Sequence, residues 1–157
     1  MKSFYRFVVF ALMVSFPIIA KAGIRIFPSQ DISGTDFHCI AQDQWGFVWI
    51  GTDYGLNKFD GYRFRKYFNS ITDSTTINDN DISNIFSDSK GRLWIGTNHG
   101  LSLYNPETDN FTRKRFPGGR THRVEQTYED HKGNIWVATA GGSLYCIPDG
   151  WRSRGRR

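Results

Sequence analysis

Three aspartates with regular spacing are the first residues in this sequence that could do chemistry. Asp43, Asp88 and Asp130 each begin a ten-residue phrase, and the phrases DQWGFVWIGT, DSKGRLWIGT and DHKGNIWVAT start 45 and 42 residues apart. Carboxylates gathered at one site would suit general acid–base catalysis. Each aspartate, however, holds the same place in its own phrase and precedes a glycine by three residues. A turn-stabilising role is therefore favoured, because Asp readily accepts a backbone N–H two residues further on. We predict no catalytic residue in this segment.

Residues that differ between the copies and lie in loops are better candidates for binding. The first two phrases are followed by Asp53-Tyr54 and by Asn98-His99. Asp53, Asn98 and His99 offer the hydrogen bonds that a sugar needs, and Tyr54 offers a stacking face and a hydroxyl. We predict these four residues to be ligand-binding, on the face that also carries Ala140-Gly141 and the longer segments Asn69–Asn80 and Pro117–Arg123.

Metal, nucleophilic and phosphate chemistry have little support in the sequence. The four histidines are His38, His99, His122 and His131, and no pair has His-x-His or His-x-x-x-His spacing. There is no Gly-x-Ser-x-Gly elbow and no Gly-rich phosphate loop. We expect neither a metal nor another cofactor.

The elements that position these residues are short strands. In the second copy, Ile82–Ser87, Arg92–Thr97, Leu101–Tyr104 and Phe111–Phe116 are apolar or alternating runs separated by turn residues. The tryptophans are expected to pack between neighbouring units, and the glycines within the strands to allow close approach. The predicted structural residues of the repeat are Asp43, Gly46, Trp49, Gly51, Thr52, Asp88, Gly91, Trp94, Gly96, Thr97, Asp130, Gly133, Trp136 and Thr139.

Four short strands in roughly 40–45 residues are typical of a β-propeller blade. We predict an all-β fold, a partial β-propeller of about three four-stranded antiparallel blades whose ring is not closed. The predicted segments are a signal peptide (1–22), a possible closure strand and linker (23–35), blade 1 (36–80), blade 2 (81–122), an incomplete blade 3 (123–150) and a basic tail, possibly non-native (151–157).

The pattern D-x-x-G-x-(L/V/I)-W-(I/V)-(G/A)-T, followed by G-L-x-x-(F/Y), resembles a known repeat, that of the two-component regulator propeller family. Two copies match fully, and the third departs at Ala138 and beyond Gly142. The resemblance covers about Gly23 to Gly150.

The resemblance implies the periplasmic sensor region of a Bacteroidetes-type hybrid two-component histidine kinase. It implies an oligosaccharide ligand, and further blades and a kinase region downstream of this segment. Two alternatives stay open: a fragment of an exported propeller lyase or hydrolase acting on polysaccharide, and a structural or protein-interaction propeller.

The N-terminal residues indicate export. A basic leader precedes Phe7–Ile19, an apolar run of 13 residues interrupted by Ser15, and Ala20-Lys21-Ala22 is a small-x-small cleavage site. Together these features predict a signal peptide. Between Gly23 and Gly150, 13 basic residues face 15 acidic ones. The basic surface that nucleic-acid binding requires is therefore missing from this part of the chain. We expect a periplasmic location, with the full-length form anchored in the inner membrane.

The sequence also bears on disulfide formation and on association between chains. Cys39 and Cys146 fall in the first and third copies, so we expect no disulfide between them, although an exported chain permits one. Ile24–Phe27 precedes the first strand and is the predicted closure strand of a complete ring. Three blades leave apolar flanks uncovered, so we expect self-association when the chain is expressed alone.

Overall fold

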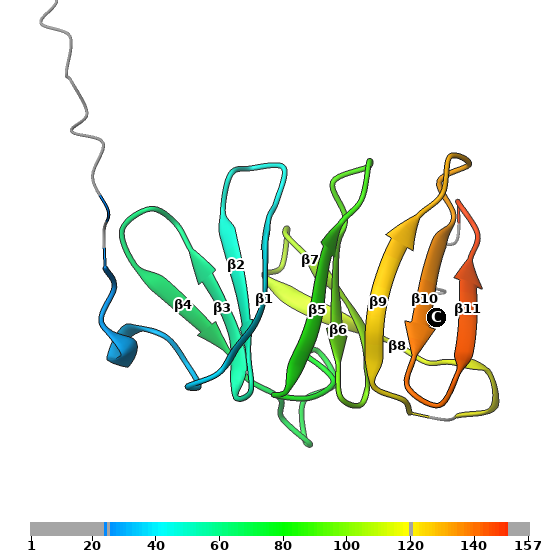
Figure 1. Ribbon diagram of the computed structural model, residues 1–157, viewed down its shortest axis with the longest axis horizontal. Helices are drawn as coiled ribbons and strands as arrows, with labels where there is room; N and C mark the ends of the chain where they lie inside the picture. The colour runs from blue at the N-terminus through cyan, green and yellow to red at the C-terminus, as the bar shows by residue number, and fades with distance from the viewer. Residues whose placement is uncertain (1–23, 25, 120, 151–157) are drawn as a thin grey trace, which may run out of the picture.

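The computed structural model describes residues 24, 26–119 and 121–150, which form three antiparallel sheets standing side by side (Figure 1). Blade 1 consists of β1 (Phe37–Gln42), β2 (Val48–Thr52), β3 (Gly55–Phe59) and β4 (Phe64–Tyr67). Blade 2 consists of β5 (Ile82–Ser87), β6 (Leu93–Thr97), β7 (Gly100–Asn105) and β8 (Asn110–Lys114). Blade 3 consists of β9 (Val124–Glu129), β10 (Ile135–Thr139) and β11 (Ser143–Ile147). The predicted all-β, unclosed propeller is confirmed, with short 3-10 turns at Ser29–Asp31 and Pro117–Gly119.

Every blade joins its first two strands by the same aspartate-glycine turn. The carbonyl oxygens of Asp43, Asp88 and Asp130 accept the N–H of the glycine three residues later at 3.1, 2.9 and 2.9 Å. Those glycines have φ angles of 87°, 72° and 79°, in the left-handed region that favours glycine. The repeated spacing of Asp and Gly is therefore explained by the backbone conformation of this turn.

The first strand of each blade carries a bulge near its start. The pairing of β1 with β2 skips one residue between Phe37 and Cys39, and the pairing of β5 with β6 skips one between Ile82 and Asn84. The pairing of β9 with β10 shifts in the same region, beside Thr139. A bulge changes the direction of a side chain and often occurs beside a functional site.

The apolar core lies between the blades. Trp49 is fully buried, and its ring contacts Tyr67 of its own blade and Tyr104 of blade 2, with centroids 5.6 and 4.7 Å apart. Trp94 is 1% exposed and packs with Val124 and Val137 of blade 3. Trp136 is only half-buried, because the described residues place no further blade beside it.

Glycine on the second strand is what lets the next blade approach. A Cβ added to Gly51 would lie 2.6 Å from Cγ2 of Ile82, and one added to Gly96 would lie 2.7 Å from Cγ1 of Val124. Ile82 and Val124 are the opening residues of the first strands of blades 2 and 3. A side chain from the neighbouring blade therefore packs directly against each of these glycines, and at Gly51 Sγ of Cys39 in the same blade is equally close.

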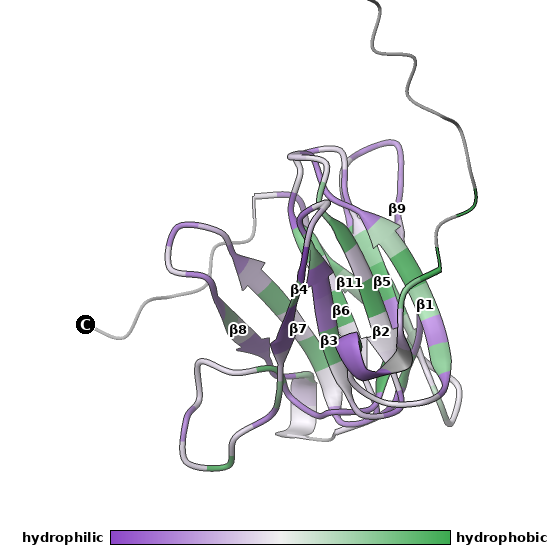
Figure 2. Ribbon diagram, turned by 90° about the vertical axis from the view of Figure 1, so that its left-hand side faces the viewer, coloured by the Kyte–Doolittle hydropathy of each residue, from purple (hydrophilic) through white to green (hydrophobic). Residues whose placement is uncertain are grey.

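Both outer flanks expose apolar side chains. Ile40 of blade 1 is 70% exposed, and Leu144 of blade 3 is 63% exposed. Seen from the side of blade 1, its outer strands β3 and β4 are more hydrophilic than β1 (Figure 2). The structure assigns no strand to the described residues Ile24, Ile26 and Phe27, so the closure strand stays a prediction, while Phe27 packs edge-on against Phe59 and Phe64.

Some of the expectations lie beyond the described residues, namely the signal peptide and the basic tail. Among the residues that the structure does describe, no helix is long and apolar enough to cross a membrane. Cys39 and Cys146 are both free thiols.

Candidate functional site

The predicted binding residues lie at one end of the blades, where the second strand of each blade turns into the third. The backbone N–H groups of Asp53 and Asn98 donate to the carbonyl oxygens of Asp36 and Asp81 at 3.1 and 3.0 Å. Ala140 does the same to Arg123 at 2.9 Å. Each bond holds the turn next to the residue that leads into the first strand of the same blade. The turn therefore lies at the same end of every blade.

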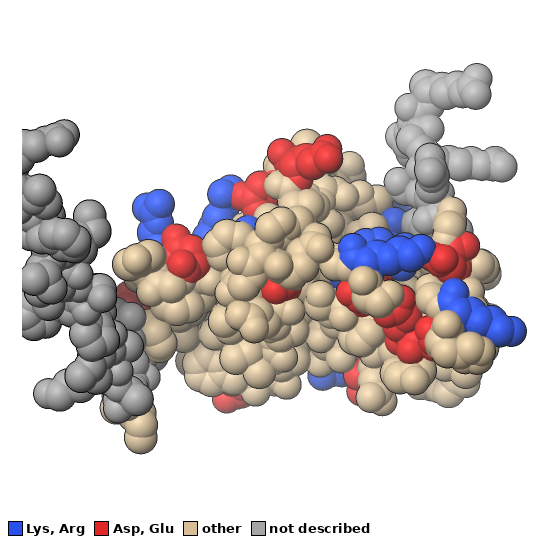
Figure 3. Space-filling model, turned by 90° about the horizontal axis from the view of Figure 1, so that it is seen from above, with Lys and Arg blue, Asp and Glu red and all other residues tan. Residues whose placement is uncertain are grey.

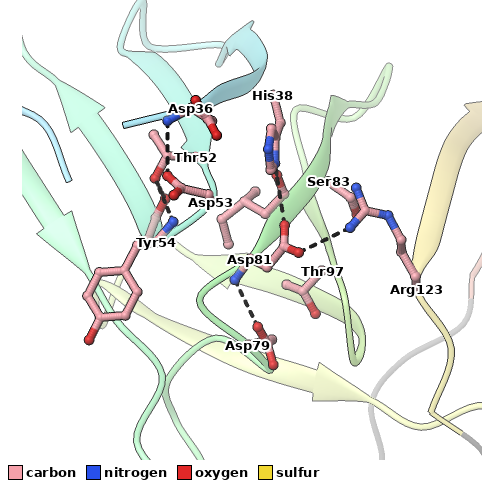
Figure 4. A network of polar contacts seen from close by, with 12 residues as sticks. Asp36, His38, Thr52, Asp53, Tyr54, Asp79, Asp81, Ser83, Thr97 and Arg123 are labelled. Carbon is pink, nitrogen blue, oxygen red and sulfur yellow. Dashed lines mark hydrogen bonds and ion pairs between the residues drawn. The ribbon is translucent and has the colours of Figure 1, made fainter. Parts of the chain in front are cut away.

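Asp53 anchors the segment that leads into blade 1. Its carboxylate accepts the N–H of Thr35 at 2.8 Å. It also accepts the N–H of Asp36 at 3.1 Å (Figure 4). The hydrogen bonds from Asp36 and Thr35 hold the pKa of Asp53 below its usual range. Neighbouring Tyr54 is 58% exposed, with its ring 5.8 Å from that of Phe68. Asp53 thus has a structural role at the edge, while Tyr54 presents its aromatic face to solvent.

Asn98 and His99 are both exposed on the turn between β6 and β7. Nδ1 of His99 lies 2.5 Å from the Asp79 carboxylate. Asp79 also accepts the N–H of Asp81 at 2.8 Å, as Figure 4 shows. Asp79 therefore orients the imidazole, whose other nitrogen remains available to a ligand.

A second polar group at this edge comes from the bulged first strands. The bulge residue His38 of blade 1 has Nδ1 3.0 Å from the carbonyl oxygen of Ile82 in blade 2. The equivalent residue Ser83 donates to the carbonyl oxygen of Val124 in blade 3 at 2.5 Å. A carbonyl oxygen only accepts, so His38 carries its proton on Nδ1. The bulges thus connect each blade to the next.

A chain of polar side chains follows the same edge across the three blades. The carboxylate of Asp81 lies 3.4 Å from Nδ1 of His38 and 3.1 Å from the guanidinium of Arg123 (Figure 4). The three side chains are between 29% and 35% exposed, so a ligand at the edge can reach them. We call His38, Asp81 and Arg123 the inner polar row.

The inner polar row was missed by the sequence analysis. One sign of it was visible, because the bulge position differs between copies as His38, Ser83 and Glu125, and the position before the strand differs as Asp36, Asp81 and Arg123. The repeated structural residues vary far less. Variation within an otherwise regular repeat is the pattern that a binding surface leaves.

A hollow of about 770 Å³ adjoins the His99 turn. Its lining brings together Asn78 from the linker before blade 2, Thr121 from the linker before blade 3, and His99. Lys114 and Phe116 add a cation and an aromatic ring. Both long linkers that were predicted to lie on the functional face therefore border one cavity, which has the size of a small-ligand site.

Metal coordination is not indicated at this edge. In the described part of the chain, no group of three or more His, Cys, Asp or Glu side chains could hold a metal ion. The arrangement instead offers hydrogen-bond donors and acceptors beside an aromatic residue, a set that is suited to a polar ligand.

Comparison with known proteins gives a consistent picture. The family model described as two component regulator propeller matches residues 31–54, 76–99 and 118–141. The extracellular domains of two putative hybrid two-component systems of B. thetaiotaomicron are structurally similar. Each is 27% identical over 80% of this chain, with TM-scores of 0.71 and 0.61.

A curated relative agrees with these structures. The protein named histidine kinase P4 of Formosa agariphila is 45% identical over 51 residues, or 32% of this chain. This chain spans 4% of the length of that relative and 19% and 18% of the two solved chains.

Proposed function

Because this chain belongs to the two-component regulator propeller family, we propose that it is part of the extracytoplasmic sensor of a hybrid two-component signalling protein. The single observation that carries the proposal is the structural match to an extracellular domain of such a system, at a TM-score of 0.71 over 80% of the chain. The location of that domain supports a periplasmic position for this segment. The whole protein would then be anchored in the inner membrane and carry further blades and a kinase region.

The ligand we propose is an oligosaccharide bound at the edge that carries the loops. The free side of His99, the amide of Asn98 and the inner polar row supply donors and acceptors suited to sugar hydroxyls. Tyr54 supplies an exposed aromatic face for a sugar ring. The site would bind its ligand unchanged, and signalling would follow from ligand-biased rearrangement against the domains downstream.

A binding screen tests the ligand class. The chain is titrated with a panel of oligosaccharides and its melting temperature is followed. A member of the panel is expected to raise Tm, because a ligand that binds only the folded state stabilises it. His99→Ala should abolish the shift, whereas His131→Ala, an exposed histidine in the turn at the opposite end of blade 3, should keep it. If no member of the panel raises Tm, the proposal of an oligosaccharide ligand is wrong. If new reducing ends are released, the proposal that the site binds its ligand unchanged is wrong.

A separate measurement tests the signalling role. Sequencing the source DNA through and beyond codon 157 should show further D-x-x-G-x-x-W repeats, a membrane span and a histidine kinase in the same frame. A genuine stop codon with no related reading frame nearby would remove the output domain and with it the sensor proposal.

A further inference from the structure

A groove of about 520 Å³ lies between blades 1 and 2, at the opposite end of the strands from the candidate functional site. Its walls come from Phe47 just before β2, from β3 and β4 with the turn between them, and from the turn between β7 and β8. Figure 3 looks onto this end of the blades, where acidic and basic side chains are interspersed. None of the candidate binding residues of the other end lines this groove.

Lys58 provides the main positive charge of the groove. Its ammonium lies 4.0 Å from the ring centroid of Phe47 and 5.2 Å from those of Trp49 and Tyr104. The ammonium donates to the Tyr104 hydroxyl at 3.1 Å. Among the described residues, no carboxylate oxygen lies within ion-pair distance of Lys58. An ammonium has three donors, so the aromatic cage holds the charge in place and leaves donors for a ligand.

The carboxylates of the groove are engaged elsewhere. Asp109 accepts the hydroxyl protons of Tyr67 at 2.7 Å and Tyr104 at 2.6 Å, and its other oxygen pairs with Arg65. Asp60 accepts two N–H groups of its own turn, including that of Arg63 at 2.8 Å. Three cationic and two anionic side chains line the groove, which leaves an excess of positive charge. A bound anion would therefore neutralise the excess positive charge of the groove.

We infer that this groove binds a ring-bearing oxyanion, such as a sugar carboxylate or a sugar sulfate, through Lys58 and Arg63. Oxyanions form charge-assisted hydrogen bonds with ammonium and guanidinium groups. Phe47 and Phe64 offer half-buried aromatic walls for the ring that carries the charge. Arg63 is 88% exposed, and its guanidinium lies 3.5 Å from the Asp60 carboxylate. An ion pair this exposed contributes little stability, so the guanidinium can also contact a ligand. This site is independent of any ligand at the His99 edge.

NMR titration of the isotopically labelled chain tests the inference through the indole N–H signal of Trp49, the ring that contacts Lys58. Glucuronate and glucose 6-sulfate should both shift this signal saturably, and glucose should not. Comparing the first two probes distinguishes a carboxylate ligand from a sulfate ligand. Inorganic sulfate should bind more weakly than glucose 6-sulfate, because it lacks the ring.

Substitutions in the groove test whether the probes bind there. Lys58→Met should weaken binding about 10-fold or more, since it removes a charge-assisted contact. Lys66→Met is the matched control, because register pairing places Lys66 on the other face of β4 and its ammonium contacts the carbonyl oxygen of Gln30. Arg63→Ala alters a highly exposed side chain and should weaken binding severalfold without unfolding blade 1. Equal affinity for glucose, no shift at about 50 mM probe, or wild-type affinity in both groove variants would overturn the site.

Discussion

The carboxylate of Asp88 accepts the indole N–H of Trp94 at 2.8 Å, six residues further along the chain. The same pair recurs as Asp43 with Trp49 at 2.7 Å and Asp130 with Trp136 at 2.9 Å. The other oxygen of Asp88 accepts the N–H groups of Lys90 and Arg92 at 3.0 and 2.8 Å. One carboxylate thus fixes the turn and satisfies the polar atom of the largest buried side chain.

Asp88→Ala should therefore destabilise the chain strongly. The substitution leaves the buried indole N–H of Trp94 and two backbone N–H groups without their acceptor, and we expect a loss of about 2–4 kcal/mol in the free energy of unfolding. Urea unfolding followed by tryptophan fluorescence measures it. Asp130→Ala is the matched comparison. It should lower the free energy of unfolding by clearly less, because Trp136 is half exposed and water can replace the carboxylate as acceptor. Equal losses in the two variants would contradict this explanation.

Gly51→Ala should destabilise the contact between blades 1 and 2. The new Cβ would lie 2.5 Å from Sγ of Cys39 and 2.6 Å from Cγ2 of Ile82, so one of them has to move. Overpacking of this kind costs about 1–3 kcal/mol. Ala138→Gly, at the equivalent position of blade 3, should change stability by less than about 1 kcal/mol.

A double-mutant cycle separates this steric explanation from a general effect on the strand. The double variant Gly51→Ala/Ile82→Ala should lose less stability than the sum of the two single variants, because the smaller side chain leaves room for the new Cβ. Strictly additive effects of the two substitutions would show that Ile82 is not the obstacle.

The sequence predicted the blades well because their causes are local. Aspartate and glycine at fixed spacing determine the first turn, and the alternating residues around Trp94 determine the strand that follows. The inner polar row was not predicted, since His38, Asp81 and Arg123 are far apart in sequence and meet only after the blades pack. Their alignment depends on bulges, whose position requires knowledge of the register between strands. The binding role of the four predicted loop residues remains a prediction, and the structure adds that Asp53 also anchors the segment before β1.

The burial of Lys114 should make the stability of the chain depend on pH. Burial, together with the positive charge of Arg92, lowers the pKa of the Lys114 ammonium from 10.5 to about 8. Below pH 8 the folded and unfolded states both carry the charge, so the folded state bears the full cost of burying it, roughly 3 kcal/mol. As pH rises from 8 toward 10.5, the folded state loses the proton first and unfolding takes one up. Stability should therefore increase through this window.

Lys114→Met isolates that contribution. The variant should show a flatter profile of unfolding free energy between pH 7 and pH 10, differing from the unmodified chain by up to about 1.4 kcal/mol per pH unit. Lys66→Met, which alters an exposed lysine, should keep the profile of the unmodified chain. Parallel profiles for all three proteins would show that Lys114 keeps an ordinary pKa in the folded state.

The two free cysteines should differ sharply in reactivity toward iodoacetamide. Burial raises the pKa of the Cys39 thiol to about 11, against a smaller opposing effect of the hydrogen bond from the backbone of Gly51. At pH 8 only about one Cys39 side chain in a thousand is then the reactive thiolate. Cys146 is exposed on β11. We expect Cys39 to be alkylated at least about 100-fold more slowly than Cys146, as followed by peptide mass spectrometry. In 6 M urea, by the ordinary behaviour of unfolded thiols, the two rates should become similar. Equal rates in the folded chain would mean that the packing between β1 and blade 2 opens on the timescale of the reaction.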